Sequence, residues 1–524
     1  MSRQKRQQKG FVLPSVLGFL VVITIIFMSV VELIGSNIVL VGNNIQSQKA
    51  FNIAEAGINY YLWHLSHNAT DYKDGQSTPT TPDPQLGYGP YVHNYVDDNA
   101  KTQGTFTLWI NPQGGGSTIV KIRAIGQVAG TSIKRTIDAQ IGAPSFASYG
   151  LVADTAVWFG NTESANGPVH SNQGIRMDGA SNSDVTSTNA TYTPPSNLGG
   201  DGSSKPGVWC HTSVTSPVNC NTRNKSDWRY PVPSVDFNAV TGSLCSIKKN
   251  AFLADSSTTS LASMPNACSQ TPSTRTAAYL PRRASTFAIN RGYLIELNNN
   301  GTYNLSQVNA ENDRNTPYTS ALTLSSVATN IAIPGSGVIF AEDNVWVRSN
   351  TTYNGRVTIG AGRLASSSQE ANIVIADDLV YAQKDGSDAI GLMAEQDILI
   401  APYAPPATGS FNFEVDAALI AQAGSVQYPS TYRTVNTCTR GWTNANQTFN
   451  FYGSVATRQS WTWTWFRGSS CGDAALQAST GNYISGVLNN TTQYDYNMLY
   501  TPPPSWPVTS TYNVLSWREV LTGP

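Results

Sequence analysis

The chain has 524 residues, a formal net charge of −1 and only 12% charged residues, about half the usual share. A chain of this length has room for several domains. Because no basic surplus exists to neutralise phosphate groups, the composition argues against nucleic-acid binding.

The chain begins with a short cationic segment followed by a long apolar run. Residues 1–10 contain four Lys or Arg residues and no acidic residue, and they end at Gly10. From Phe11 to Val31 the sequence is uncharged and almost wholly apolar, long enough at about 1.5 Å per residue to cross a hydrocarbon core of about 30 Å. The cationic segment is predicted to stay in the cytoplasm and the rest to be exported. A cleaved secretory signal is the alternative, but no small-residue cleavage site precedes Glu32.

Apolar residues continue at helical spacing beyond this run, so one helix is predicted over about 15–67. At standard rise it would be about 80 Å long, far more than a bilayer requires. Its second half is predicted to pack against other helices in a filament core, through Phe51, Ala54, Ile58, Tyr61, Leu62 and Leu65.

Two segments resemble type IV pilins. KGFVLPSVLGFLVVITIIF is similar to the class III signal of prepilins, in which a prepilin peptidase cuts after a glycine; Gly10 and Phe11 match the cut. AFNIAEAGINYYLWHL resembles the amphipathic region of PilX-type minor pilins. The resemblance implies prepilin peptidase and other major and minor pilins as partners. It also implies residence in the cytoplasmic membrane before assembly, and then in an extracellular pilus.

One position departs from the family pattern. Major pilins carry a Glu at the fifth residue after the cut, where Ser15 stands here. A carboxylate in lipid is normally retained only where a partner neutralises it. By analogy with K-type pseudopilins, its absence favours a subunit at or near the filament tip. Sequence drift in a subunit placed anywhere in the filament is the alternative.

The region 68–142 is predicted to form a small pilin-like sheet, because alternating apolar residues follow a Pro- and Gly-rich stretch. Beyond it lies an internal repeat. Residues 152–159 match 340–347, and residues 166–169 match 354–357 at the same offset. Weaker copies place further alanine anchors at Ala376, Ala394 and Ala421.

A repeated unit with one apolar face requires stacked copies to bury that face. Residues 143–430 are therefore predicted to form a parallel β-helix or solenoid head with an insertion over about 181–324. A β-sandwich of similar strands is the alternative. Residues 431–524 are predicted to form an aromatic-rich β or cap region, in which prolines 502–504 fix an extended run over the solenoid end.

Six cysteines in an exported chain predict disulfides rather than a zinc site, because no close CxxC pair occurs. Free buried thiols are the alternative. Six cysteines allow 15 connectivities, and sequence proximity favours the pairs Cys210–Cys220, Cys245–Cys268 and Cys438–Cys471.

Acidic residues recur at the corners of the repeat, and they offer two interpretations. Stacked, they would form a carboxylate ladder that binds Ca²⁺ or imitates polysaccharide-cleaving β-helices; acids at turns also serve solvation and local hydrogen bonding, which is favoured here. They are Asp154, Glu342, Asp377 and Glu395. The five histidines lack metal-ligand spacing, and no nucleophile, phosphate-loop or dinucleotide motif occurs. No metal or cofactor is expected.

The run WTWTWF places Trp461, Trp463 and Trp465 on one face if it forms a strand. Exposed, such a face would contact a ligand; buried, it would fill a core.

The sequence therefore predicts an α+β protein with a long N-terminal helix and a mainly β head. The predicted function is that of a minor pilin at the pilus tip or in assembly initiation, whose head adheres to an unidentified surface, host-cell ligand or partner. No enzymatic activity is expected. The alternatives are a membrane-anchored β-helix enzyme acting on polysaccharide and a surface-anchored adhesin outside any pilus.

Overall fold

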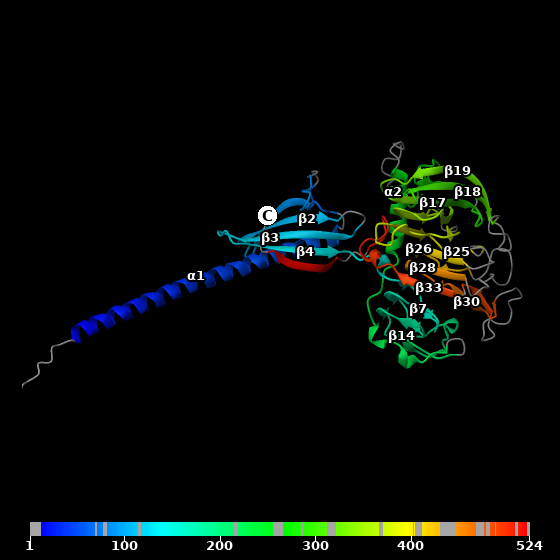
Figure 1. Ribbon diagram of the computed structural model, residues 1–524. Coiled ribbons are helices and arrows are strands. Elements are labelled where there is room, and N and C mark those ends of the chain that lie inside the picture. The colour runs from blue at the N-terminus through cyan, green and yellow to red at the C-terminus, as the bar shows by residue number, and fades with distance from the viewer. Residues whose placement is uncertain are drawn as a thin grey trace, which may run out of the picture. The chain divides into compact units, whose positions relative to one another are not determined.

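The computed structural model shows a long helix followed by a large β-rich region (Figure 1), which confirms the predicted α+β class. The chain divides into two compact units. Unit 1 comprises residues 1–112, 119–142 and 512–524; unit 2 comprises residues 113–118 and 143–511. The structure describes residues 12–68, 71–76, 81–113, 117–213, 217–254, 266–283, 287–311, 321–365, 370–401, 403, 411–429, 447–467, 476–477, 483–487, 489–508 and 512–520.

Unit 1 consists of one helix packed on one face of a five-stranded antiparallel sheet of order β1-β2-β3-β4-β34. The helix runs over the range predicted, within a few residues at its start. The elements are α1 (Val12–His67), β1 (Tyr88–Val96), β2 (Thr102–Pro112), β3 (Ile119–Val128), β4 (Lys134–Gly142) and β34 (Asn513–Val520).

Small residues let the helix and the sheet approach closely. A Cβ at Gly126 of β3 would lie 2.1 Å from the carbonyl oxygen of Ala50 and 2.4 Å from the amide nitrogen of Ala54. Gly57 on the helix meets the ring of Phe106 in the same way, with a Cβ 3.1 Å from it. The Ala-Glu-Ala-Gly segment therefore has small side chains where it faces the sheet, because a strand backbone and an aromatic ring pack against it there.

The last strand of unit 1 comes from the end of the chain. β34 pairs antiparallel with β4 from Asn513 opposite Gly142 to Val520 opposite Thr136. Residues 431–524 were expected to form an aromatic-rich β or cap region, but residues 513–520 complete the sheet of unit 1. Unit 2 is thus inserted in sequence between two neighbouring strands of unit 1.

Unit 2 contains two long sheets of mainly parallel strands. The first has the order β15-β11-β8-β5-β28-β26-β24-β22-β20-β16, with β33 beside β28. Its strands are β5 (Leu151–Ala153), β8 (Val169–Ser171), β11 (Val185–Ser187), β15 (Trp228–Arg229), β16 (Tyr279–Leu280), β20 (Val338–Ala341), β22 (Arg356–Ala361), β24 (Ala389–Ala394), β26 (Phe411–Ala421), β28 (Gln447–Thr457) and β33 (Asn489–Tyr494).

The second long sheet has the order β19-β18-β17-β21-β23-β25-β27-β29, and a three-stranded sheet has the order β14-β9-β6. Their strands are β17 (Gly292–Leu297), β18 (Thr302–Glu311), β19 (Leu322–Ala332), β21 (Asn344–Ser349), β23 (Ile373–Ile375), β25 (Ile398–Ile400), β27 (Val426–Gln427), β29 (Trp461–Thr462), β6 (Val157–Phe159), β9 (Ile175–Met177) and β14 (Val208–Trp209).

The remaining elements are short and lie around these sheets. They are β7 (Ser164–Ala165), β10 (Ala180–Ser181), β12 (Thr191–Tyr192), β13 (Lys205–Pro206), β30 (Thr464–Arg467), β31 (Leu476–Gln477), β32 (Tyr483–Gly486), α2 (Ala239–Leu253) and the 3-10 turns η1 (Phe146–Ser148), η2 (Ser196–Leu198), η3 (Cys220–Thr222), η4 (Lys225–Asp227) and η7 (Tyr496–Leu499).

Small residues stack in register along the first long sheet. The successive partners are Ala341, Ala361, Ala394, Ala421, Thr457, Ala153, Ser171 and Ser187. The internal repeat is therefore structural, because Ala153 and Ala341 occupy equivalent places in one stack. Ala376 was expected to be an anchor of the same kind, but it follows β23 of the second sheet, and Ala361 holds the equivalent position.

The order of the stack differs from the order of the chain. β5 follows β28 directly, and the segment 181–324, expected to be an insertion, supplies β11, β15 and β16 to the same sheet. Residues 447–457, expected to lie beyond the head, form β28 in the middle of the sheet.

A second ladder joins consecutive turns of the chain through side chains. Asn344 Oδ1 accepts from the Asn372 N–H at 3.0 Å, Asn372 Oδ1 accepts from the Asp397 N–H at 3.0 Å, and Asp397 Oδ1 accepts from the Ser425 N–H at 2.7 Å. The Ser425 hydroxyl continues the series to the Ser460 N–H at 3.2 Å. Each polar side chain thereby satisfies a turn amide of the next layer, as buried backbone groups require.

The proline-rich segment lies across the face of the first sheet rather than over its end. The Arg356 guanidinium donates to the Thr501 carbonyl at 2.9 Å. A Cβ at Gly391 of β24 would lie 2.5 Å from the ring of Trp506, so glycine is required where that ring sits on the strand. Trp506 is 5% exposed. This segment and α2 give the sheet a second buried face.

We expect Gly126→Ala to destabilise unit 1, because even one methyl group would overlap the helix backbone at Ala50 and Ala54. Overpacking of this kind costs about 1–3 kcal/mol. Hydrogen exchange of the β3 amides, measured on the detergent-solubilised full-length protein, should report the loss. Gly160→Ala is the matched control, because a Cβ there meets nothing within 4 Å. Equal protection in both variants would contradict the prediction.

Candidate functional site

The largest apolar surface left exposed in the described residues lies on the first half of α1. Ile34, Ile38, Val41 and Ile45 are 53%, 68%, 57% and 52% exposed. Glu32 is the only charged residue from Phe11 to Gln48. α1 is also the one described helix that is long and apolar enough to cross a membrane. A surface of this extent requires lipid or protein to cover it.

A bilayer accounts for only part of this surface. The stretch from Val12 to Val31 spans about 30 Å, which equals a hydrocarbon core. The sheet of unit 1 begins to cover the helix at Ala50, which is 0% exposed. The segment 33–45 lies between these two stretches, and all of its residues are exposed. We call residues 33–45 the free helix segment.

Most of the residues predicted to pack between helices are instead covered by this chain's own sheet. Ala54, Ile58, Tyr61 and Leu65 are between 0% and 6% exposed. The prediction is wrong for these four residues, because the apolar stripe at helical spacing faces β2, β3 and β4 rather than a partner. Phe51 and Leu62 are half-buried, and Phe51 contacts Trp517 of β34 with ring centroids 5.8 Å apart.

The end of α1 is tied to the loop that follows it. His64 Nε2 lies 3.1 Å from Asp71, and His93 Nε2 lies 2.7 Å from Asp74. The Tyr60 hydroxyl also donates to Asp74, and burial raises the pKa of Tyr60 to about 12. His67, three residues after His64, forms a hydrogen bond with the carbonyl of Trp63. Within the described ranges no group of His, Cys, Asp or Glu side chains could hold a metal ion.

The acidic corner residues do not form an open carboxylate ladder. Glu342 is fully buried, pairs with Lys248 of α2, and accepts from Arg282 at 3.3 Å. Burial lowers the pKa of Lys248, and the charge of Glu342 opposes that shift. Glu395 accepts from the backbone N–H groups of Arg363 and Ala371.

The two remaining corner acids have separate surroundings. Asp154 accepts from Asn172 at 2.7 Å and lies 3.5 Å from Arg458. Asp377 accepts from the backbone N–H of Asp378 at 2.9 Å. All four corner acids thus have partners from the fold itself, which supports the structural interpretation over a catalytic pair.

A group of acids lies beside the corner at Asp377. Burial, together with the charges of Asp377, Glu414 and Asp416, raises the pKa of Asp378 to about 6. Asp378 accepts from the Glu414 N–H at 2.8 Å, and Lys384 neutralises Asp416 at 2.8 Å. The cluster therefore has one cation for four acids and destabilises the ionised form of Asp378 at neutral pH.

Two of the predicted disulfides are present, Cys210–Cys220 and Cys245–Cys268. A pocket of about 370 Å³ beside the second one has no carboxylate or imidazole in its lining. Cys438 and Cys471 lie outside the described residues, as do Gly10 and Phe11.

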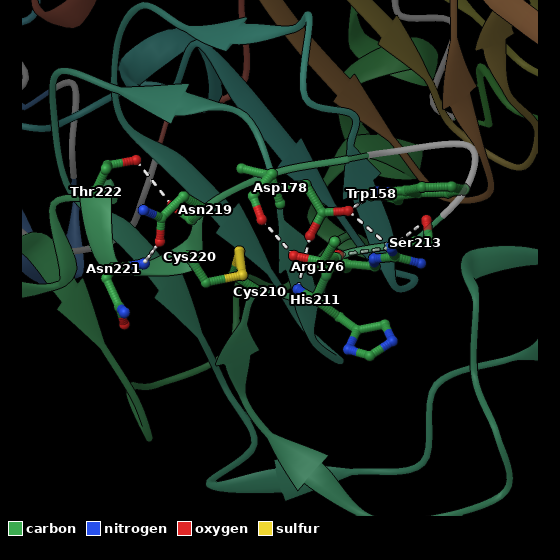
Figure 2. Close-up of a disulfide and its surroundings, with 12 residues drawn as sticks. Trp158, Arg176, Asp178, Cys210, His211, Ser213, Asn219, Cys220, Asn221 and Thr222 are labelled. Carbon is green, nitrogen blue, oxygen red and sulfur yellow. Dashed lines mark hydrogen bonds and ion pairs between the residues drawn. A yellow bond between two sulfur atoms is a disulfide. The ribbon is translucent and has the colours of Figure 1, made fainter. Parts of the chain in front are cut away.

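The Cys210–Cys220 disulfide closes a loop over a buried cation (Figure 2). Arg176 is 1% exposed and stands in register between two aromatic residues of neighbouring strands, 4.2 Å from the ring centre of Trp158 and 5.4 Å from that of Trp209. Its guanidinium lies 2.8 Å from Asp178, which is 0% exposed. Asp178 also accepts from the Trp158 indole at 2.9 Å. The group is a buried ion pair flanked by two aromatic rings.

The three tryptophans do not share one strand. β29 ends at Thr462, and β30 begins at Thr464 in a different sheet. Trp463 is 3% exposed and packs against Phe449 with ring centroids 5.0 Å apart, while Trp461 packs against Phe159 at 5.1 Å. The ligand-contact prediction is wrong for Trp463, because the core covers its ring. The side chain of Trp465 lies outside the described part of the chain.

No protein-family model matches the chain, and no curated protein matches it. Among solved structures, the chain is similar to the competence-associated pilin ComZ from Thermus thermophilus, at 12% identity and a TM-score of 0.31. The match covers 91% of this chain and 98% of that one. A TM-score this low gives the similarity no weight for the fold or the function of this chain.

Arg176→Met should destabilise unit 2, because Asp178 would then be a buried charge without its cation. Removing one partner of a buried pair costs about 3–5 kcal/mol. Denaturant unfolding of the full-length protein measures the change. Arg229→Met breaks the exposed pair with Asp184, and such pairs contribute about 0–1 kcal/mol. Similar losses of unfolding free energy in the two variants would contradict the stabilising role of the Arg176–Asp178 pair.

Asp378→Asn should stabilise unit 2 above pH 6 and have little effect near pH 4. In the folded protein the pKa of Asp378 is raised from 3.8 to about 6, so the folded state binds more protons than the unfolded state between these values. The free energy of unfolding therefore falls as pH rises through that window. Unfolding measured at several pH values checks this. Asp385→Asn is a control of opposite sign, because the Ser387 hydroxyl lowers the pKa of Asp385.

Proposed function

We propose that this chain is a minor subunit of a type IV pilus-like filament, with α1 in the filament core and the β-rich head outside the cell. The observation that carries the proposal is the free helix segment. Lipid can cover residues 12–31, and the sheet covers the helix from Ala50 onward, but exposed apolar residues remain over 33–45. Helices of other subunits packed alongside would cover them.

The fold of unit 1 supports the same function. A helix projecting from an antiparallel sheet presents its free half to neighbours without disturbing the sheet, because none of residues 13–45 is buried. The resemblance of the first residues to a prepilin signal adds processing between Gly10 and Phe11 by a prepilin peptidase, and residence in the membrane before assembly.

We place the subunit at or near the tip for two reasons. Ser15 stands where a carboxylate would pair with a neighbour's amine, and a head the size of unit 2 is hard to fit between laterally packed subunits. The parallel ladders of unit 2 are proposed to be coils of a parallel β-helix, a stiff support that presents a contact surface to other cells, surfaces or partner proteins.

The pairing of the corner carboxylates within the fold argues against the alternative of a polysaccharide-cleaving enzyme, which requires an accessible acid pair. Glu342 is 0% exposed and already paired. We therefore propose that the chain performs no chemical step. Glycan depolymerisation by the purified protein would overturn this part of the proposal.

Val41→Asp tests the filament role. Val41 is 57% exposed, so the fold should tolerate the change, whereas a carboxylate without a cation between packed helices should reduce incorporation at least about tenfold. The amount of the protein in sheared filaments, relative to the whole-cell amount, gives the readout. Asn59→Asp is the control, because Asn59 is exposed on the sheet-covered half of α1. Equal incorporation of both variants would contradict the proposal.

Processing is tested separately by mass spectrometry of the N-terminus in native material. The expected start is Phe11, with or without methylation. Retention of residues 1–10 together with absence from any fibre fraction would favour a non-pilus anchored adhesin.

A further inference from the structure

The insertion of unit 2 between β4 and β34 makes the closing of unit 1 depend on both ends of the insertion. The chain leaves the sheet after Gly142 and returns at Asn513, and these two residues are paired opposite each other. β34 is the last strand of unit 1, and its position beside β4 requires that the two ends of the inserted chain be brought together.

The folded head brings its own ends together. The Phe146 N–H donates to the Pro507 carbonyl at 3.0 Å, and Ser145 forms an antiparallel bridge with Val508. The Ser145 hydroxyl donates to the Met498 carbonyl at 3.0 Å, and Ser145 is 0% exposed. The chain therefore enters and leaves the head through two segments that are hydrogen-bonded to each other.

β34 in turn holds the helix at the place where its free half begins. Trp517 contacts Phe51, and Glu519 pairs with Arg135. Arg135 also donates to Ser47 of α1. These contacts are made with Ser47 and Phe51, on either side of Ala50. Ala50 is the first helix residue that is fully covered. We call the contacts of Trp517 and Glu519 the helix clamp.

We propose that folding of the head and closing of the helix clamp are coupled, so that the pilin-like unit is complete only when the inserted head is folded. The physical cause is loop closure. An unfolded insertion over 143–511 must lose chain entropy before β34 can reach β4, and that cost grows with the logarithm of loop length. A folded head removes this cost, because it holds β34 near β4 at high effective concentration.

Through this coupling, the helix clamp depends on a completely folded head. Residues 513–520 follow the whole head in sequence, so they are synthesised after it. A subunit whose head is unfolded or incomplete would carry a helix that is loosely held at residues 47–51. This coupling is a property of the fold and holds whether or not the helix enters a filament, so its test is independent of the proposed function.

The test compares amide hydrogen exchange in the detergent-solubilised full-length protein and in Leu392→Asp, which places a charge in the head core at a 0% exposed position. Exchange within the head verifies that it has unfolded. We then expect exchange of β4 and of residues 46–51 to rise at least about tenfold, although no residue of unit 1 has changed. Wild-type protection in both regions would overturn the coupling.

An engineered disulfide between β4 and β34 should restore protection of the helix even when the head is unfolded. Gln140 and Ser516 are paired opposite each other, and neither is buried. In the Leu392→Asp background, Gln140→Cys with Ser516→Cys under oxidising conditions should restore protection at residues 46–51, and reduction should remove it. Protection that stays low after oxidation would show that the head acts on the helix by another route.

The clamp itself is tested with the head intact. Trp517→Ala should raise exchange at residues 46–51 and leave the head unchanged, because it removes the contact with Phe51. Arg518→Ala is the matched control on the same strand, because its side chain is 80% exposed. Equal exchange in these two variants would show that Trp517 does not hold the helix.

Discussion

The structure depends on one constraint: what covers the single helix α1 changes at Ala50. On the C-terminal side of Ala50, the apolar stripe of α1 is covered by the sheet of its own unit. On the N-terminal side of Ala50, exposed aliphatic side chains extend beyond the length that a bilayer can cover. The cost of leaving that surface in water would be large, since burial stabilises by about 25 cal/mol per Å². We therefore propose that other helices cover the free helix segment, and both the proposed location and the proposed function follow from that proposal.

The head differs from the helix, because the polar groups that join its layers have partners within the fold. The stack of alanine and serine residues lets neighbouring strands fit closely, while the Asn344–Asn372–Asp397–Ser425 series satisfies turn amides between layers. The charged groups that the sequence singled out as possible sites are paired inside the fold, as Glu342 is with Lys248. We propose that such a head presents a surface rather than converts a small molecule.

Local patterns predicted some of these features well. The length of the helix follows from a 3.6-residue period, two disulfides follow from proximity in sequence, and the equivalence of Ala153 with Ala341 follows from one repeated offset. Each of these signals is contained in a short segment or in a direct match between two segments. The sequence prediction missed the free helix segment, because it assigned packing to residues 51–65 instead.

The features that escaped prediction depend on distant pairing. β34 joins β4 across the whole head, and periodicity in residues 513–520 does not reveal which sheet they complete. Ala376 matched the repeat in sequence, yet the register of β23 places it in the other sheet. The period of Trp461, Trp463 and Trp465 suggested one strand, but the chain changes sheets at Trp463, whose ring fills the core. A helical stripe is equally apolar whether its partner is its own sheet or another subunit.

Photocrosslinking in living cells tests the central claim most directly. A photoreactive amino acid placed at Val41, in the free helix segment, should form covalent adducts with the helices of other subunits, whereas the same group at Ala54 should react only within its own chain. Adducts at position 41 with lipid alone, or no protein adduct at all, would contradict the account, because the free helix segment would then have no protein partner.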